Sequence, residues 1–166
     1  MPTKSQILRK EQILTKWLQT RQSILGETSK LSEKQRDRVF LGIWSIKDLL
    51  AHLTGWDRTN KDAVKSVLEG QLPAFYNHHD RDWRTYNALL VREYNRDSFK
   101  ELLTLLKDSQ EQLLEFLNTL PPEVFGKDFG VRFRGYKVTI QRLLEAETKD
   151  EQIHLKQMTD FLKASE

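Results

Sequence analysis

Apolar residues recur at three- and four-residue steps along most of the chain, which is the periodicity of amphipathic helices. The first such run predicts a helix over residues 4–24. A polar stretch, GETSKLSEKQRD, follows it and predicts a loop. The apolar stripe of this first helix consists of Ile7, Leu14, Trp17, Leu18 and Ile24.

A second helix is expected from Ser45 to about Glu69. The Ser45 hydroxyl can accept a hydrogen bond from the Asp48 amide while the Asp48 carboxylate reaches back, which is the capping-box pattern. Gly70 follows the last periodic position and Pro73 lies just beyond. A glycine and then a proline are typical of the end of a helix, so the helix should stop there.

Two helices are predicted in the middle of the chain. The first is short, and Asp80 or Asp82 is expected to cap it. The second begins at Ser98, which forms another capping-box pattern with Glu101, and it ends at the prolines of LPPE. The stripe of the short helix consists of Trp83, Tyr86, Leu90 and Tyr94.

Residues 123–137 are punctuated by glycines and are expected to be irregular, with a short extended piece at VRFRGYKV. The last helix should begin near Thr139 and run to about Lys163. The elements together predict an all-α fold, a four-helix bundle with one short additional helix. The length of 166 residues fits a single domain over residues 1–166.

Composition excludes several classes of protein and site. Hydrophobic residues make up 38% of the chain and charged residues 31%, which is ordinary for a globular protein. The absence of cysteine excludes disulfides, thiolate metal sites and cysteine nucleophiles. No segment is apolar enough to cross a membrane, and MPTKSQILRKEQ has no signal-peptide pattern. A cytoplasmic location without a membrane partner is expected.

Positive charge is spread rather than concentrated. The net charge is +3, and the two signs are interleaved along most helices. The densest basic piece is VRFRGYK, residues 131–137, whose interleaved aromatic residues could hold single-stranded nucleic acid. Three charges on one loop are explained more simply as a solvated edge, so no nucleic-acid partner is expected.

The apolar face of the second helix carries one histidine. In WSIKDLLAHLTGWD, His52 lies at helical spacing from Leu49, Leu53 and Trp56, so its imidazole should lie among core side chains. Two interpretations are open: a core histidine with a satisfied hydrogen bond, or a ligand. Asp48, one turn earlier, could hold the other ring nitrogen, although capping is the simpler role.

The last helix has a polar break in its inward stripe. Leu143, Met158 and Phe161 lie at the ends of the stripe, but Glu147, Asp150 and His154 occupy its middle. Burying three ionisable groups is costly unless something compensates them. Asp150 and His154 are four residues apart and therefore project from one face of the helix, as two ligands of one metal must.

If the second and last helices are neighbours, His52 supplies a third ligand. Two imidazoles and a carboxylate suit a divalent metal ion (zinc, nickel or ferrous iron) and leave coordination positions open for water or substrate. The His52 and His154 nitrogens should then lie within roughly 3–4 Å of each other. Glu147 is the candidate catalytic base or orienting group beside such a site.

NHHDRDW contains the other two histidines, His78 and His79. They could ligate a metal together with an aspartate. Adjacent residues of an extended segment point in different directions, however, so a solvated loop is the simpler interpretation.

Two segments resemble a known family. WSIKDLLAHLTGW, residues 44–56, is similar to the second-helix signature of the DinB/YfiT-like superfamily of four-helix bundles, and DEQIHLKQM, residues 150–158, is similar to its final-helix pattern. That family usually carries a three-histidine metal site. His52 and His154 match two of its positions, and Asp150 stands where the family more often has a histidine.

Within the superfamily, the chain is most similar to the ClbS/DfsB-type branch, on WSIKDLLAHLTGWD, LPAFYNHHDRDWRTYNALLV and FGVRFRGYKVT. The resemblance implies a metalloenzyme that acts on a small electrophilic molecule by activating water or a thiol. It also implies a homodimer, a low-molecular-weight thiol as co-substrate and a role in toxin or stress resistance.

Three hypotheses remain open from the sequence. The first is a metal-dependent hydrolase or thiol transferase whose metal is held by His52, Asp150 and His154. The second is a bundle that binds or sequesters a small molecule without turnover. The third is a structural dimer in which Asp150 has replaced a ligand and the metal site is lost.

Overall fold

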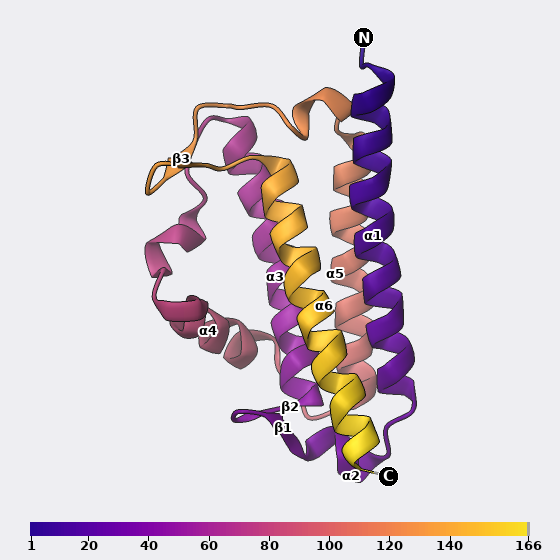
Figure 1. Ribbon diagram of the computed structural model, residues 1–166. Helices are drawn as coiled ribbons and strands as arrows, with labels where there is room; N and C mark the ends of the chain where they lie inside the picture. The colour runs from indigo at the N-terminus through magenta and orange to yellow at the C-terminus, as the bar shows by residue number, and fades with distance from the viewer. Residues whose placement is uncertain (166) are drawn as a thin grey trace.

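The computed structural model describes residues 1–165. In this part of the chain four long helices lie side by side: α1 (Lys4–Ser29), α3 (Ile46–Leu68), α5 (Phe99–Thr119) and α6 (Ile140–Ala164). Helices α1 and α6 run in one direction and α3 and α5 in the other (Figure 1). The prediction of an all-α four-helix bundle is confirmed.

The connection between α1 and α3 is more ordered than its polar sequence predicted. It contains the short helix α2 (Glu33–Asp37), capped by Ser32, and an antiparallel hairpin of β1 (Val39–Leu41) and β2 (Trp44–Ser45). Helix α1 also extends beyond residue 24 to Ser29, and the hydroxyls of Thr28 and Ser29 donate to carbonyls of its last turns. Such short or polar-ended elements lack the apolar repeat that reveals a longer helix.

The segment between α3 and α5 forms a side layer beside the bundle. It consists of two 3₁₀ turns, η1 (Ala74–His78) and η2 (Arg81–Trp83), and the predicted short helix α4 (Arg84–Tyr94). The connection to α6 contains η3 (Pro122–Val124) and a hairpin of β3 (Arg132–Phe133) and β4 (Tyr136–Lys137), which is the expected extended piece.

The predicted helix caps are confirmed in part. Ser45 and Asp48 form the full capping box at the start of α3, and the Thr139 side chain caps α6. Ser98 caps α5, but the return bond from Glu101 is not formed, so that capping box was only half right.

The start of α4 differs from the prediction. The N-cap position of α4 is Trp83, with φ of 55°, rather than Asp80 or Asp82. Asp80 still satisfies the helix start, since its carboxylate accepts hydrogen bonds from the Thr85 amide and hydroxyl. The Asp80 carboxylate therefore stabilises the start of α4 from outside the helix, before the N-cap position.

A layer of polar side chains divides the apolar core into two clusters. One cluster lies toward the start of α1 and α6, and the other toward their ends. Between them each long helix contributes at least one buried polar or charged side chain: Arg21, His52, Asp57, Ser109, Glu147, Glu151 and His154. The candidate site lies in this layer.

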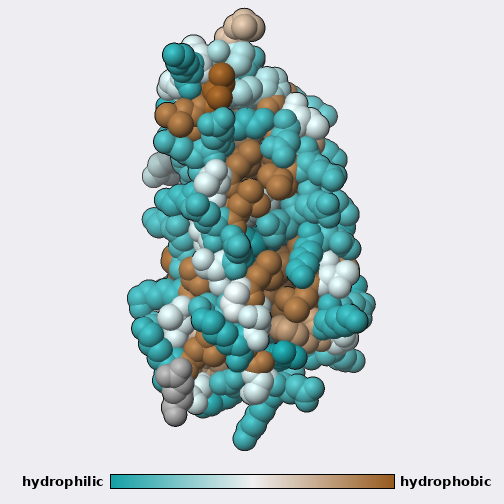
Figure 2. Space-filling view, turned by 90° about the vertical axis from the view of Figure 1, so that its right-hand side faces the viewer, coloured by the Kyte–Doolittle hydropathy of each residue, from teal (hydrophilic) through white to brown (hydrophobic). Residues whose placement is uncertain are grey.

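The surface on the α1 side of the bundle is mostly hydrophilic. Figure 2 shows charged and polar residues over most of this face, with separate apolar patches between them. Ile7 and Leu8 near the start of α1 are among the exposed apolar residues. The homodimer remains a prediction.

Gly55 lets α4 approach α3 closely. A Cβ atom at Gly55 would lie 2.7 Å from Leu90 Cβ and 2.9 Å from Leu90 Cδ2. We therefore expect Gly55→Ala to lower the free energy of unfolding by about 1–3 kcal/mol through overpacking, measured by urea denaturation.

Gly26→Ala is the matched control, because Gly26 lies in α1 and a Cβ there would have no atom within 4 Å. Alanine is the better helix former by roughly 0.5–1 kcal/mol, so this variant should be slightly more stable than the wild type. Equal stability changes in the two variants would contradict the proposed close approach of α4.

Candidate metal centre

His52, Asp150 and His154 come together between α3 and α6. One ligand atom from each lies within 4.8 Å of the other two. Asp150 Oδ2 lies 3.5 Å from His52 Nε2 and 3.2 Å from His154 Nε2. The condition that these two helices are neighbours is therefore met, although the 4.8 Å limit is wider than the roughly 3–4 Å expected between the His52 and His154 nitrogens for shared ligation of one ion.

The His52 imidazole is buried, and neither nitrogen makes a regular hydrogen bond, although Nε2 lies 3.5 Å from the Asp150 carboxylate. Burial lowers the pKa of His52 below its ordinary value, and the Asp150 carboxylate only partly opposes this. The Trp44 ring packs on it, with centroids 4.9 Å apart. Asp48 does not hold the second nitrogen, because its carboxylate accepts bonds from Ser45 and Asn95 instead. The capping interpretation of Asp48 was the right one.

The His154 imidazole has a partner on each nitrogen. Nδ1 lies 2.8 Å from Gln157 Oε1, and Nε2 faces Asp150. Burial alone would lower the pKa of His154, but Asp150 and Gln157 outweigh burial and raise it. Because Nδ1 can donate to the Gln157 oxygen, loss of the other proton would leave the Nε2 lone pair free for a metal.

Asp150 lies between the two imidazoles, and its side chain is 47% exposed. Partial burial would raise the pKa of Asp150, but the two imidazoles outweigh it and hold the pKa well below its ordinary value. The carboxylate is thus charged, and it faces both ring nitrogens on one side and solvent on the other. This geometry allows it to act as the third ligand.

Glu147 lies one turn before Asp150 and outside the group of three. Its side chain is buried, and Oε1 has no hydrogen-bond partner. Burial raises the pKa of Glu147 well above its ordinary value, and the negative charges of Glu151 and Asp150 add to this effect. The environment therefore favours the neutral acid, which can donate a proton, over the charged base that the sequence suggested.

A buried ion-pair network adjoins the site, and sequence reasoning missed it. Arg21 Nη1 and Nη2 donate to the Asp57 carboxylate at 2.9 and 2.8 Å, and Arg21 Nε donates to Glu151 at 3.1 Å. Ser109 donates to Asp57, and the Trp17 indole donates to Glu151. All four long helices meet in these contacts.

The sequence did hold a signal for the network. Arg21 continues the stripe of Leu14, Trp17 and Ile24 at helical spacing, which would have indicated an inward-facing charge. Only the fold shows that Asp57 and Glu151 are its partners, because they lie on other helices.

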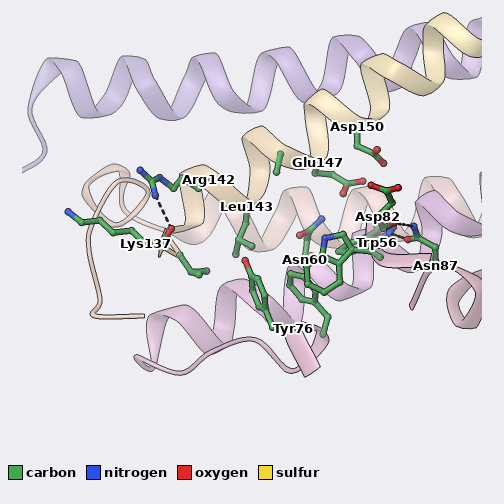
Figure 3. Close-up of a pocket in the computed structure, with 14 residues that line it drawn as sticks. Trp56, Asn60, Tyr76, Asp82, Asn87, Lys137, Arg142, Leu143, Glu147 and Asp150 are labelled. Carbon is green, nitrogen blue, oxygen red and sulfur yellow. Dashed lines mark hydrogen bonds between the residues drawn. The ribbon is translucent and has the colours of Figure 1, made fainter. Parts of the chain in front are cut away.

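A cavity of about 300 Å³ opens beside the site (Figure 3). Asp150 and Glu147 form part of its α6 wall, and Asn60 extends into it from α3. Aromatic side chains make up much of the remainder: Trp56, Phe75, Tyr76 and Trp83. Apolar pockets with a few convergent polar groups are typical of small-molecule sites.

His78 and His79 take no part in the candidate centre. The His78 ring packs near Tyr86 and the His79 ring near Trp83, with centroids 5.4 and 4.3 Å apart. Within residues 1–165, His52, Asp150 and His154 form the one group of three potential ligands.

In the metal-free protein, Asp150→Asn should lower the pKa of His154. The carboxylate is a main cause of the raised pKa, and burial opposes it. A raised histidine pKa adds stability below the unfolded value of about 6.5, and this stability is lost as the pH rises through the folded-state pKa. The variant should therefore lose most stability at mildly acidic pH.

NMR titration of the imidazole signals tests this expectation. The signal of His78, which lies outside the candidate centre, serves as the internal control. An unchanged His154 pKa in Asp150→Asn would contradict the electrostatic role of Asp150.

The chain is similar to a known protein family and to a solved structure. Residues 16–158 match the family model described as the DinB superfamily. The crystal structure of an uncharacterised protein from Escherichia coli UTI89 has a TM-score of 0.72 to this chain, at 15% sequence identity and over 94% of each chain. At this identity the likeness shows the shared fold. No curated protein matches the chain.

Among residues 1–165, no helix combines the length and the apolar character needed to cross a membrane.

Proposed function

The chain belongs to the DinB superfamily, and from this premise we propose that it is a metal-dependent enzyme acting on a small electrophilic molecule. The observation that carries the proposal is the group of His52, Asp150 and His154, whose ligand atoms lie within 4.8 Å of one another at the edge of a cavity. The ClbS/DfsB-type branch, and with it a role in toxin or stress resistance, remains a prediction.

The residues present fit a divalent cation. His52 has two buried nitrogens without a partner, and a buried polar group without a partner is costly. A metal bond to one of them would compensate part of that cost. Two imidazole nitrogens and one carboxylate oxygen suit zinc, nickel or ferrous iron, and three protein ligands leave at least one position open.

A bound ion would supply Lewis acidity, by which water or a thiol becomes nucleophilic near neutral pH. The protein's own groups divide the remaining work. Gln157 holds His154 in one orientation through Nδ1. Glu147, which is buried beside the cavity and favours its neutral form, is placed to give a proton to a leaving group. The aromatic walls of the cavity offer the substrate an apolar surface.

One observation favours the alternative that the metal site has been lost. The Asp150 carboxylate already faces both imidazoles, and its charge compensates a protonated His154 without any metal. A structural bundle, or one that sequesters a small molecule in the cavity, would then be the function.

Metal analysis of protein purified without a histidine tag separates these functions. We expect close to one divalent ion per chain, strongly reduced in His52→Ala and His154→Ala and retained in the control His78→Ala. Turnover of electrophilic probes, with and without low-molecular-weight thiols, should follow the metal content. Substoichiometric metal that none of the three variants alters would refute the metalloenzyme and leave the alternatives.

A further inference from the structure

Two buried polar atoms at the cavity have no hydrogen-bond partner within residues 1–165. Asn60 is only 2% exposed, and within residues 1–165 its amide nitrogen Nδ2 has no hydrogen-bond partner. Glu147 is 7% exposed, and its Oε1 is also without a partner. Both residues line the cavity, Asn60 from α3 and Glu147 from α6, and Figure 3 shows both side chains extending toward it.

Leaving such groups unpaired is unfavourable for folding. A buried amide or carboxyl group without a partner costs on the order of 1–3 kcal/mol, and replacement by an apolar group of the same shape is often neutral or stabilising. Two of them facing one cavity therefore indicate that a ligand completes their hydrogen bonds.

The chemistry of the two groups restricts the ligand. An asparagine amide offers one acceptor and two donors, and a neutral carboxyl group offers one donor and acceptor capacity. The matching ligand group presents a donor and an acceptor side by side, as the N–H and C=O of an amide do. The unpaired Asn60 Nδ2 can donate to the ligand carbonyl and the unpaired Glu147 Oε1 can accept from the ligand N–H, so a group that only accepts would leave Oε1 unsatisfied.

The walls of the cavity restrict the rest of the ligand. Trp56 packs edge-on against Phe75 at 5.2 Å, and its indole nitrogen donates to Asn87 Oδ1 at 2.8 Å, which fixes the ring. Tyr76 stacks on Phe75 at 4.3 Å. Such fixed aromatic faces favour a flat, apolar ring system.

The charges around the cavity balance. Asp82 and Asp150 contribute negative charge, and Lys137 and Arg142 contribute positive charge. Lys137 lies 3.5 Å from the Asp128 carboxylate, which also binds Arg132, so its charge is partly compensated. Neither an anion nor a cation is favoured by this set, and a neutral ligand fits it best.

We propose that Asn60 and Glu147 form a recognition pair for a neutral, planar molecule that carries an amide group next to an aromatic or conjugated ring. The proposal deepens the proposed function by naming a substrate class for the same cavity. It requires no metal for binding, so it can be tested apart from the metalloenzyme.

Benzamide, acetophenone and benzoate are probes of similar size. Benzamide has the donor and the acceptor, acetophenone lacks the donor, and benzoate lacks the donor and also carries a negative charge. Binding is measured by NMR shift perturbation on the protein as purified and again after chelation. We expect benzamide to bind at least about tenfold more tightly than the other two, which corresponds to about 1.4 kcal/mol.

Variants of the pair sharpen the test. Asn60→Leu keeps the side-chain shape but removes all hydrogen bonding, and it should weaken benzamide at least about tenfold, as loss of a buried hydrogen bond does. Glu147→Gln keeps a donor and an acceptor and should retain binding, whereas Glu147→Leu should lose it. Asn118→Leu, at an exposed position of α5, is the control and should change nothing.

A thermal readout distinguishes recognition from a structural role. If Asn60 serves a ligand, Asn60→Leu removes an unpaired buried amide, and the melting temperature of the ligand-free protein should rise by roughly 2–4 °C. A fall in melting temperature would mean that Asn60 supports the fold, and it would overturn the proposal.

Equal binding of the three probes, or benzamide binding that Asn60→Leu leaves unchanged, would also overturn it. Because each titration is repeated after chelation, benzamide binding to metal-free protein supports the recognition pair even if the metalloenzyme fails. Binding that disappears on chelation counts against the pair, since it would place the probe on the metal.

Discussion

Replacing Arg21 with methionine should lower the free energy of unfolding by about 3–5 kcal/mol, the cost typical of removing one partner from a buried ion pair. Arg21 is fully buried and is shared by Asp57 and Glu151. Without it, two buried carboxylates face each other with no cation between them. Methionine fills a similar volume, so the loss should come from charge rather than from a cavity.

Urea denaturation of the variant, followed by circular dichroism, measures this loss. Arg81→Met is the control, because the Arg81 side chain is 90% exposed and its removal should change stability by less than about 1 kcal/mol. Adding Asp57→Asn and Glu151→Gln to Arg21→Met should restore part of the stability. Equal unfolding free energies for the Arg21 and Arg81 variants would show that the network does not stabilise the fold.

The network also links stability to the candidate centre. Glu151 follows Asp150 directly and lies one turn before His154, and the Arg21 guanidinium holds it against α3 through Asp57. A shift of α6 along its axis would break these bonds. The bonds thereby fix the register in which Asp150 and His154 face His52, which gives a charged network a positional role beyond its contribution to stability.

Local patterns explain which parts of this architecture the sequence predicted. The helices follow from apolar periodicity, and the start of α3 follows from the capping box of Ser45 and Asp48, because both depend on residues within one or two turns. The polar break in the apolar stripe of α6 likewise singled out Asp150 and His154 as candidate ligands, although the sequence alone did not show that His52 on α3 lies beside them.

Features that depend on distant residues were harder to predict. Asp57 on α3 and Glu151 on α6 share Arg21, and this depends on which helices are neighbours. The recognition role of Asn60 depends on the same arrangement. The hairpin that places Trp44 against His52 is too short to show a repeat. The sequence also does not show that burial favours the neutral form of Glu147, since that depends on the whole surrounding layer.

Asp150 decides whether the candidate centre holds a metal, and its replacement should have the largest effect on metal affinity. Asp150→Asn removes the only charged ligand, and we expect affinity for Zn²⁺ to fall by at least about 100-fold, the upper end of what loss of a supporting group around a metal costs. Asp150→His supplies a third imidazole and should bind Zn²⁺ at least as tightly as the wild type.

Competition with a chromophoric chelator measures these affinities over a range of pH. Asp160→Asn is the matched control, since Asp160 also lies on α6, is mostly exposed and pairs with Lys156. In the wild type, Zn²⁺ has to displace the proton that Asp150 and Gln157 favour on His154, so affinity should weaken as the pH falls through the His154 pKa. If the Asp150→Asn and Asp160→Asn proteins bind Zn²⁺ equally well, the carboxylate of Asp150 is not a ligand. Strong binding by Asp150→His alone would instead mean that the natural aspartate has abolished an otherwise complete site.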